Sequence, residues 1–379
     1  MTNRCDYLQT MSILICIATL GSCAAASQPD AEVPPAADGA SKTQSLIDSS
    51  EWLNFPTGVR GIFEDRKGNL WFASRDGLCR YTPSATDSGD DELVYFKGDF
   101  ESIVVGGIQE DSKGQIWLQS DRGIHRLDGE TFTRITDRDY SNKDQWAMAD
   151  GDLWFGVDAG VNFSQAEGQW GAYRLRDGVG TFFAFPEPPS GERHRFYPLT
   201  SGAMHGKDGL LWFGTFNAAF GFDGESFDII GRERMGRADD PRDIGLRGYH
   251  LDRNGNLWMA DNGAGVYVYN GTSVDHFTAT HKLRDEDTDG NSLHRSFSIA
   301  EDDEGNIWFG TIYSGVWRYE PSESDPLGQG VFTNYAQEQG LPCEGIWTIY
   351  KTRSGELLFA GTDPDGVYRF NEGVFERVF

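Results

Sequence analysis

The sequence is poor in basic residues and lacks long apolar runs and catalytic signatures. It has 33 Lys and Arg against 59 Asp and Glu, a formal net charge of −26. A surface this acidic repels phosphate backbones, which excludes nucleic acid as a partner. The apolar run from Met11 to Leu20 is too short to span a bilayer, and no candidate membrane helix follows residue 50. No nucleophile elbow, His-Glu-x-x-His or Cys-x-x-Cys occurs, so an enzyme would have no recognisable centre.

The first 50 residues have the pattern of an export signal followed by a tether. The apolar run ends in "LGSC", whose last residue is Cys23, and a lipoprotein signal peptidase reads this pattern. We expect a signal peptide at 1–22 and lipidation of Cys23; the alternative is ordinary cleavage after the alanines at 24–26. The residue after Cys23 is not Asp, which is typical of an outer-membrane, periplasm-facing lipoprotein. Residues 23–50 are rich in Ala, Pro and Ser and predict a flexible tether.

Beyond the tether, one short pattern recurs seven times. It contains an Asp-x-x-Gly turn, a Trp and a Gly-Leu or Gly-Val pair, as in "DRKGNLWFASRDGLCRY" at 65–81. The copies "DGDLWFGVDAGVNF" at 150–163 and "KDGLLWFGTFNAAFGF" around Trp212 are looser, and the copy around Leu358 has no Trp. The marker positions 71, 117, 154, 212, 258, 308 and 358 are 46, 37, 58, 46, 50 and 50 residues apart. A unit of about 40–50 residues is the period of a propeller blade or a solenoid turn.

Each unit predicts four short antiparallel strands. Pairs such as Asp128-Gly129 join the third and fourth strands, because they accept the positive φ of a tight hairpin. No helical period of ten residues follows residue 50, and the outer units are not polar enough to cap a solenoid. We therefore predict an all-β fold, a single seven-bladed β-propeller of four-stranded antiparallel blades at 51–379. Both Glu51–Phe55 and Val374–Phe379 could close blade seven, and we expect the C-terminal strand to stay with its own blade.

Two registers predict which residues surround the axis. Ten residues before each marker, or seven in the shorter third blade, stands a small residue, as the crowded axis of a propeller requires: Gly61, Gly107, Ala147, Gly202, Gly248, Ser298 and Thr348. One position earlier, six blades have residues that would line the channel mouth: Arg60, Gly106, Ser201, Arg247, Phe297 and Trp347. The long connections between blades lie on this side, and insertions in repeat proteins gather on the binding face.

The candidate ligand-binding residues come from this mouth and its loops. They are Arg60, Arg247, Trp347, Tyr197, His294 and Arg295. Arginine forks bind carboxylates and Trp offers a flat apolar face, so the set suits a polar ligand with an anionic group or sugar rings. The alternative is that each arginine pairs with a loop carboxylate. For catalysis, His250 and His294 could act as acid and base while Arg247 holds a carboxylate.

The acidic loop "DEDTDG" resembles the start of a calcium loop. It places Asp285, Asp287 and Asp289 at alternate positions before a glycine. The twelfth position is Ser296 instead of the bidentate Glu, so a solvated loop is favoured and no cofactor is expected.

Cysteines are few, five in the whole chain. Cys79 is expected in an outer strand and Cys343 near the axis. We therefore expect two isolated thiols and no disulfide between them.

The repeats "EDRKGNLWFASRDGLCRY" and "EDDEGNIWFGTIYSGVWRY" resemble those of the two-component-regulator propeller family, the periplasmic sensor propellers of hybrid histidine kinases. The resemblance implies a propeller that receives extracellular nutrients, often glycans. In that family the propellers usually occur in tandem, before a membrane span and a kinase. This sequence has one propeller and neither of the others, so we expect no direct signalling by it. The repeats are also similar to those of the virginiamycin B lyase group.

Three functions remain open from the sequence. The first is a sensor-like or substrate-capturing lipoprotein, which binds a small molecule, glycan or peptide without turnover. The second is a lyase or hydrolase on the same scaffold, and the third is an interaction platform for an envelope protein. We expect a monomer in each case, and membrane contact only through the N-terminal lipid.

Overall fold

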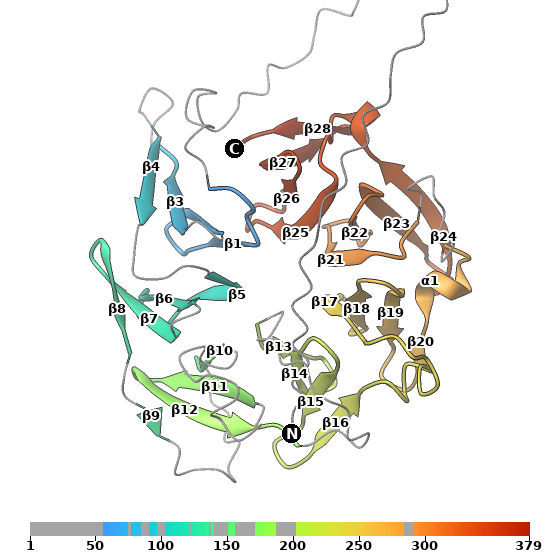
Figure 1. Ribbon diagram of the computed structural model, residues 1–379, viewed down its shortest axis with the longest axis horizontal. Helices are drawn as coiled ribbons and strands as arrows, with labels where there is room; N and C mark the ends of the chain where they lie inside the picture. The colour runs from blue at the N-terminus through green and yellow to red at the C-terminus, as the bar shows by residue number, and fades with distance from the viewer. Residues whose placement is uncertain are drawn as a thin grey trace, which may run out of the picture. The chain divides into compact units, whose positions relative to one another are not determined.

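The computed structural model describes residues 56–74, 77–84, 91–96, 103–120, 123–135, 138–139, 151–155, 171–186, 202–283 and 292–379. These residues form seven four-stranded sheets, which are arranged around a common centre (Figure 1). The predicted seven-bladed β-propeller is confirmed. No helix among the described residues is long and apolar enough to cross a membrane.

In every blade except blade 3 the strands follow one another along the chain, and the first strand lies nearest the centre (Figure 1). Blades 1 and 2 consist of β1 (Gly61–Glu64), β2 (Leu70–Ala73), β3 (Leu78–Thr82), β4 (Glu92–Phe96), β5 (Ile103–Glu110), β6 (Ile116–Ser120), β7 (Gly123–Asp128) and β8 (Thr131–Arg134). Blades 3 and 4 consist of β9 (Arg138–Asp139), β10 (Leu153–Phe155), β11 (Gly171–Arg176), β12 (Val179–Ala184), β13 (Met204–His205), β14 (Leu211–Gly214), β15 (Ala219–Phe222) and β16 (Phe227–Ile230).

Blades 5 to 7 are described most completely. Their strands are β17 (Leu246–Leu251), β18 (Leu257–Asp261), β19 (Gly265–Tyr269), β20 (Val274–Asp275), β21 (Ser296–Glu301), β22 (Ile307–Thr311), β23 (Val316–Ser322), β24 (Asp325–Tyr335), β25 (Gly345–Lys351), β26 (Leu357–Thr362), β27 (Gly366–Asn371) and β28 (Val374–Arg377). A four-residue helix, α1 (Phe277–Thr280), follows blade 5, and a 3-10 turn, η2 (Gln337–Gln339), precedes blade 7.

Blade 3 departs from the prediction. The repeat would place residues 160–163 beside the Trp154 strand, but those residues lie outside the described part, and β11 pairs with β10. The outer position belongs to β9, which precedes the blade in the chain and runs parallel to β12. All other described strand pairs are antiparallel.

The Asp-x-x-Gly turns are stabilised by the carboxylate that opens them. In blade 5, Oδ1 of Asp252 accepts the backbone N–H of Asn256 at 2.8 Å. Its Oδ2 accepts the side-chain amide of Asn256 at 2.7 Å and the indole N–H of Trp258 at 2.8 Å. Equivalent indole bonds join Trp71 to Asp65 and Trp308 to Asp302. One carboxylate thus holds the turn and orients the buried Trp of the next strand. We call the side of the ring that carries these turns the turn face.

Side chains on the turn face connect neighbouring blades. The backbone N–H of Arg253 donates to Oε2 of Glu301 at 2.8 Å, and its Nε also donates to that carboxylate. Arg66 reaches Glu110 and Arg353 reaches Glu64 in the same way, with backbone bonds of 2.8 and 2.7 Å. The last of these bonds links blade 7 to blade 1, so the ring closes through a contact that it repeats elsewhere.

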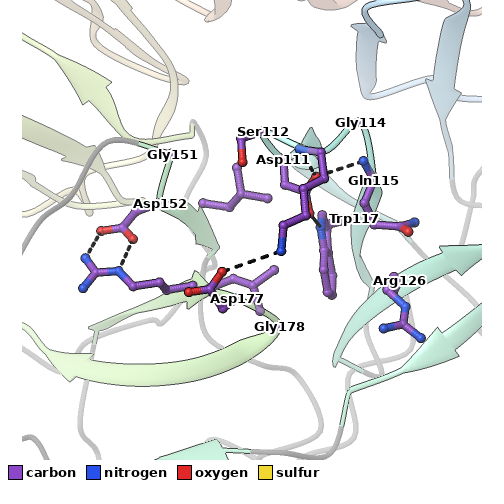
Figure 2. A pocket seen from close by; sticks show the side chains of 14 residues that line it. Asp111, Ser112, Gly114, Gln115, Trp117, Arg126, Gly151, Asp152, Asp177 and Gly178 are labelled. Carbon is purple, nitrogen blue, oxygen red and sulfur yellow. Dashed lines mark hydrogen bonds and ion pairs between the residues drawn. The ribbon is translucent and has the colours of Figure 1, made fainter.

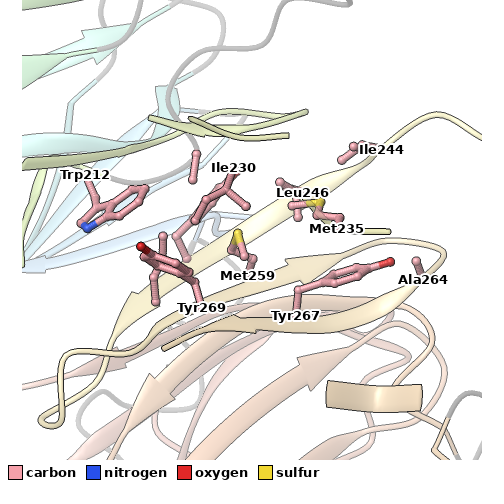
Figure 3. Close-up of a cluster of buried hydrophobic side chains, with 12 residues drawn as sticks. Trp212, Ile230, Met235, Ile244, Leu246, Met259, Ala264, Tyr267 and Tyr269 are labelled. Carbon is pink, nitrogen blue, oxygen red and sulfur yellow. The ribbon is translucent and has the colours of Figure 1, made fainter. Parts of the chain in front are cut away.

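Apolar side chains fill the space between blades. Figure 3 shows the cluster between blades 4 and 5, where Trp212 and Ile230 pack against Met259 and Tyr269. Met235, from the connection between the two blades, is part of the same cluster. The connection is therefore anchored in the core.

The C-terminal strand β28 pairs with β27, so it stays with blade 7 as predicted. Glu372 and Gly373 form the turn between them at φ 47° and 92°. Glu51–Phe55 lies outside the described residues. Cys79 and Cys343 are buried free thiols, as expected. Burial raises the pKa of Cys79 to about 12 and that of Cys343 to about 11, so both stay protonated at neutral pH.

Candidate functional site: a row of arginines and aromatic rings

Three inner strands share the same irregularity at the end where the chain enters the blade. The register skips one residue at Arg247 in β17, at Phe297 in β21 and at Trp347 in β25. A β-bulge sets two residues against one on the partner strand and redirects the extra side chain. A β-bulge thus redirects one side chain at the same end of the inner strand in each of three successive blades. We call this side of the ring, where the blade connections lie, the connection face.

The presented side chains touch one another around the ring. The guanidinium of Arg247 lies 4.4 Å from the ring centre of Phe216 in blade 4 and 5.4 Å from that of Phe297 in blade 6. Phe297 meets Trp347 of blade 7 at 4.6 Å and an interplanar angle of 78°. The guanidinium of Arg60 in blade 1 lies 3.9 Å from the centre of the Trp347 ring. Phe216, Arg247, Phe297, Trp347 and Arg60 form a continuous series, which we call the axial row.

Small residues next to the row let the inner strands approach. A Cβ atom on Gly248 would come within 2.6 Å of the carbonyl oxygen of Phe297. The hydroxyls of Ser298 and Thr348 donate to the next blade, to the carbonyl oxygens of Ile346 and Arg60 at 3.3 and 2.6 Å. The prediction of a crowded axis is confirmed at these three positions.

One other position of the predicted small-residue register differs. A Cβ on Gly202 would meet nothing within 4 Å, so crowding does not explain that glycine. Ala147 lies outside the described residues.

A buried ion pair fixes the connection that borders the row. Nη1 of Arg237 donates to Oδ2 of Asp261 at 2.9 Å, and its Nε donates to Asp240 at 3.1 Å. Arg237 and Asp261 are only 5% and 1% exposed, so each charge depends on the other. Gly245, just before β17, also donates its N–H to Asp261 at 3.0 Å. This network fixes the chain immediately before Arg247.

The two histidines of the enzyme hypothesis are not brought together. His250 lies at the far end of β17, paired across the ladder with Trp258 next to the Asp turn. Its Nε2 is 3.7 Å from Glu301. His294 precedes β21 on the connection face, where its carbonyl accepts the N–H of Gly263. The blade separates them, so they cannot act as acid and base on one substrate.

The other predicted residues have mixed outcomes. Arg295 is exposed on the connection face, with its guanidinium 5.7 Å from the Tyr313 ring. Tyr197, Cys23 and the three aspartates Asp285, Asp287 and Asp289 lie outside the described residues. Within the described ranges, no group of three or more His, Cys, Asp or Glu residues could hold a metal ion. Sequence reasoning missed Phe216, whose only signal is its place in a turn on the same face.

A cavity of about 450 Å³ lies elsewhere, between blades 2 and 3 on the turn face (Figure 2). Its cations already have partners. Arg176 makes two bonds of 2.6 Å to Asp152, and Nζ of Lys113 lies 3.8 Å from Asp177. Ser112 stands where blades 1, 5 and 7 have the arginine that contacts the next blade, which explains the open space. An anionic ligand would have to break an ion pair here, and the described lining of the cavity lacks the stacked aromatic rings that orient the arginines of the axial row.

Comparisons with known proteins agree with the repeat pattern. A model of the two component regulator propeller family matches residues 55–76 and 289–313, the first and the sixth repeat. The chain thus carries repeats of that family at these positions. A comparison with curated proteins gave no significant match.

Solved structures show the same fold. A catalytically inactive virginiamycin B lyase from Staphylococcus aureus, crystallised with quinupristin, is 16% identical, with a TM-score of 0.52 over 84% of this chain and 95% of the lyase. The WD40 propeller of Doa1 is 12% identical, with a TM-score of 0.52 over 83% and 93%. The extracellular domain of a B. thetaiotaomicron hybrid two-component system is 22% identical, covering 85% of this chain and 45% of that one, but its TM-score of 0.35 supports no argument. At these identities the likeness establishes the fold and not an activity.

Proposed function

We propose that this protein is a ligand-binding propeller without catalytic activity, which holds a polar, anionic ligand on the axial row. The observation that carries the proposal is the pair Arg60 and Arg247, each stacked on aromatic rings and set on either side of Trp347 and Phe297. Stacking occupies the flat face of a guanidinium and leaves its N–H edge for a carboxylate. The rings therefore orient both guanidinium groups, which can donate hydrogen bonds to a bound anion.

Binding is favoured over turnover by the position of the histidines. A lyase or hydrolase needs an acid and a base within reach of one substrate, and His250 and His294 lie on opposite faces. The likeness to virginiamycin B lyase supports the scaffold only. The match to a family of regulator propellers supports a sensor-like role, with a glycan, a peptide or another polar molecule as ligand.

Calorimetry with Arg60→Ala and Arg247→Ala tests the row, once a glycan and peptide array has supplied a ligand. Each substitution should weaken binding by about 1.5–3 kcal/mol, the range for a hydrogen bond to a charged group. The unfolding free energy should change little, because the small residues and the core set the packing of the blades.

Arg126→Ala is the matched control. Arg126 lines the cavity on the turn face and pairs with Asp128 of its own hairpin at 2.9 Å. Its removal should leave the affinity unchanged. If Arg126→Ala weakens binding while both row variants bind normally, the ligand occupies the cavity and the row is not the site.

We further propose that Cys23 carries a lipid that anchors the propeller to the outer membrane, facing the periplasm. The support is the "LGSC" sequence that ends in Cys23. Cys23→Ser should abolish incorporation of labelled palmitate and move the folded protein to the soluble fraction. Cys16→Ser, in the same leader, should change neither. Membrane association of the Cys23→Ser protein would disprove the anchor.

A further inference from the structure

Tyr313 adopts a backbone conformation that bulky residues avoid, and it is exposed to solvent. Its φ is 73°, in the left-handed region where a side chain costs about 1–3 kcal/mol. The residue is 61% exposed. Among the exposed large apolar side chains of the described residues it is the only aromatic one. Burial therefore does not explain this strained aromatic residue.

The surrounding turn imposes the conformation. Thr311 donates its N–H to the carbonyl of Gly315 at 3.1 Å, and its hydroxyl accepts the N–H of Ser314 at 3.1 Å. Tyr313 donates its own N–H to the carbonyl of Glu344 at 2.5 Å. With both sides of the turn fixed, the ring is held outward on the connection face.

The turn borders the axial row. Ile312 bridges to Gly345, two residues before Trp347, and the guanidinium of Arg295 lies 5.7 Å from the Tyr313 ring centre. At strand spacing, the Tyr313 and Trp347 backbones are about 10 Å apart. Tyr313 and the neighbouring Arg295 thus lie beside the axial row, on the side away from the axis.

The two places offer different chemistry. In the row, each ring already has a guanidinium or another ring against it, and Phe297 is only 6% exposed. The ring faces of the row are therefore largely covered, whereas Tyr313 is 61% exposed and offers an apolar face to solvent even with Arg295 beside it. A sugar chain would need several open ring faces in succession. A peptide needs one place for a carboxylate and one for a ring.

We infer that Tyr313 and Arg295 form a second subsite and that the ligand is an extended acidic peptide. This rests on the proposed function, because the peptide carboxylate occupies the row between Arg60 and Arg247. An aromatic or proline side chain stacks on Tyr313. A separation of about 10 Å corresponds to three residues of extended chain.

The probes are acetyl-Phe-(Gly)n-Glu-amide peptides with n from 0 to 4, measured by calorimetry. Affinity should peak near n = 2. Exchanging the peptide's Phe for Ala should weaken binding about three- to tenfold, the value of one aromatic contact. The protein variant Tyr313→Gly should remove that difference, and Tyr313→Phe should keep it.

Stability distinguishes a binding residue from a structural one. Because glycine accepts positive φ, Tyr313→Gly should raise Tm while weakening binding. Glu372→Gly is the matched control: its φ is 47° in the β27–β28 turn on the other face. It should not lower Tm and should leave peptide binding unchanged.

The failures are distinguishable. If Tyr313→Gly binds every peptide like the wild type while Arg60→Ala and Arg247→Ala bind weakly, the row stands and the second subsite does not. If all three variants bind like the wild type, the proposed function fails as well. A lower Tm for Tyr313→Gly assigns the ring a structural role. Oligogalacturonates that bind through Tyr313, in place of the peptides, would overturn the peptide assignment.

Discussion

At the scale of single residues, the aspartate that starts the turn accepts the indole N–H of the marker Trp in blades 1, 2, 5 and 6. In blade 7 a threonine, Thr352, takes this position, and its hydroxyl accepts the N–H of Glu356 at 3.0 Å. The Trp position of that blade is Leu358, fully buried and with no N–H to satisfy. In blade 7 the aspartate and the Trp are thus both replaced, and no indole N–H needs an acceptor there. Blade 4 keeps a buried Trp212 although Gly206 takes the aspartate position, so the two residues can also change independently.

Asp252→Ala should therefore lower the free energy of unfolding by about 2–4 kcal/mol, since it leaves the buried indole of Trp258 and the turn amides without their acceptor. Urea unfolding followed by Trp fluorescence measures the loss. Asp208→Ala is the control, because Asp208 is exposed and accepts one bond, from the N–H of Leu210 at 3.0 Å. The double variant Asp252→Thr, Trp258→Leu should cost less than its two single changes added together.

The sequence predicted the row only in part, for reasons visible at the same scale. Its constant spacing from the marker brought Arg60, Arg247 and Trp347 together correctly, since repeats place equivalent residues at equivalent points. The bulges depend on which residue of the inner strand is left without a partner on the next strand, and no local pattern shows this. His250 was placed wrongly because closeness to Arg247 in sequence hides a separation along β17.

At the scale of elements, the packing of one blade against the next depends on single carboxylates such as Glu301, which accept hydrogen bonds from the turn of the neighbouring blade. Burial alone would raise the pKa of Glu301, but the neighbouring His250 and the hydrogen bonds from Arg253 outweigh it, and the pKa is lower than usual. Its stabilising effect is thus fully present above the ordinary value of 4.5 and is lost as the pH falls through the lowered pKa.

Glu301→Gln should cost about 1–2 kcal/mol of unfolding free energy at pH 7, where the charged bonds are lost. The difference from the wild type should shrink below pH 4.5, as the wild-type carboxylate takes up a proton. Urea titrations at pH 7, 5 and 3.5 measure it. Glu304→Gln, exposed in the next turn, is the control and should follow the wild type. A difference that persists unchanged at pH 3.5 would contradict the role of the charge.

Blade 3 shows where prediction at this scale ends. The hairpins of the other blades are local, so turn residues and a period-two pattern were enough to predict them. In blade 3 the strand beside β10 comes from Gly171–Arg176 and the outer edge from β9. Neither pairing can be predicted from the adjacent sequence, because each depends on which distant segment pairs with the free edge of the sheet.

At the scale of the whole molecule, closure brings the two ends of the ring together. Phe379 is fully buried, with its ring centre 4.7 Å from that of Phe72 and 5.1 Å from that of Tyr81 in blade 1. Its carbonyl accepts the N–H of Val367 at 3.0 Å. The last residue of the chain therefore fills the joint between blades 7 and 1, in one cluster with Ile62 and Leu358.

Phe379→Ala should lower the unfolding free energy by about 3–5 kcal/mol, the usual cost of emptying a buried aromatic position. The effect should also be directional. Hydrogen exchange should quicken in β3 and β27, on either side of the joint, before it does so in β18, on the opposite side of the ring, because opening begins where the closing contacts are lost. Val374→Ala, in the same C-terminal strand but 46% exposed, should be nearly neutral. Uniform acceleration in all blades would show that the ring unfolds as one unit and that Phe379 is not a local closure.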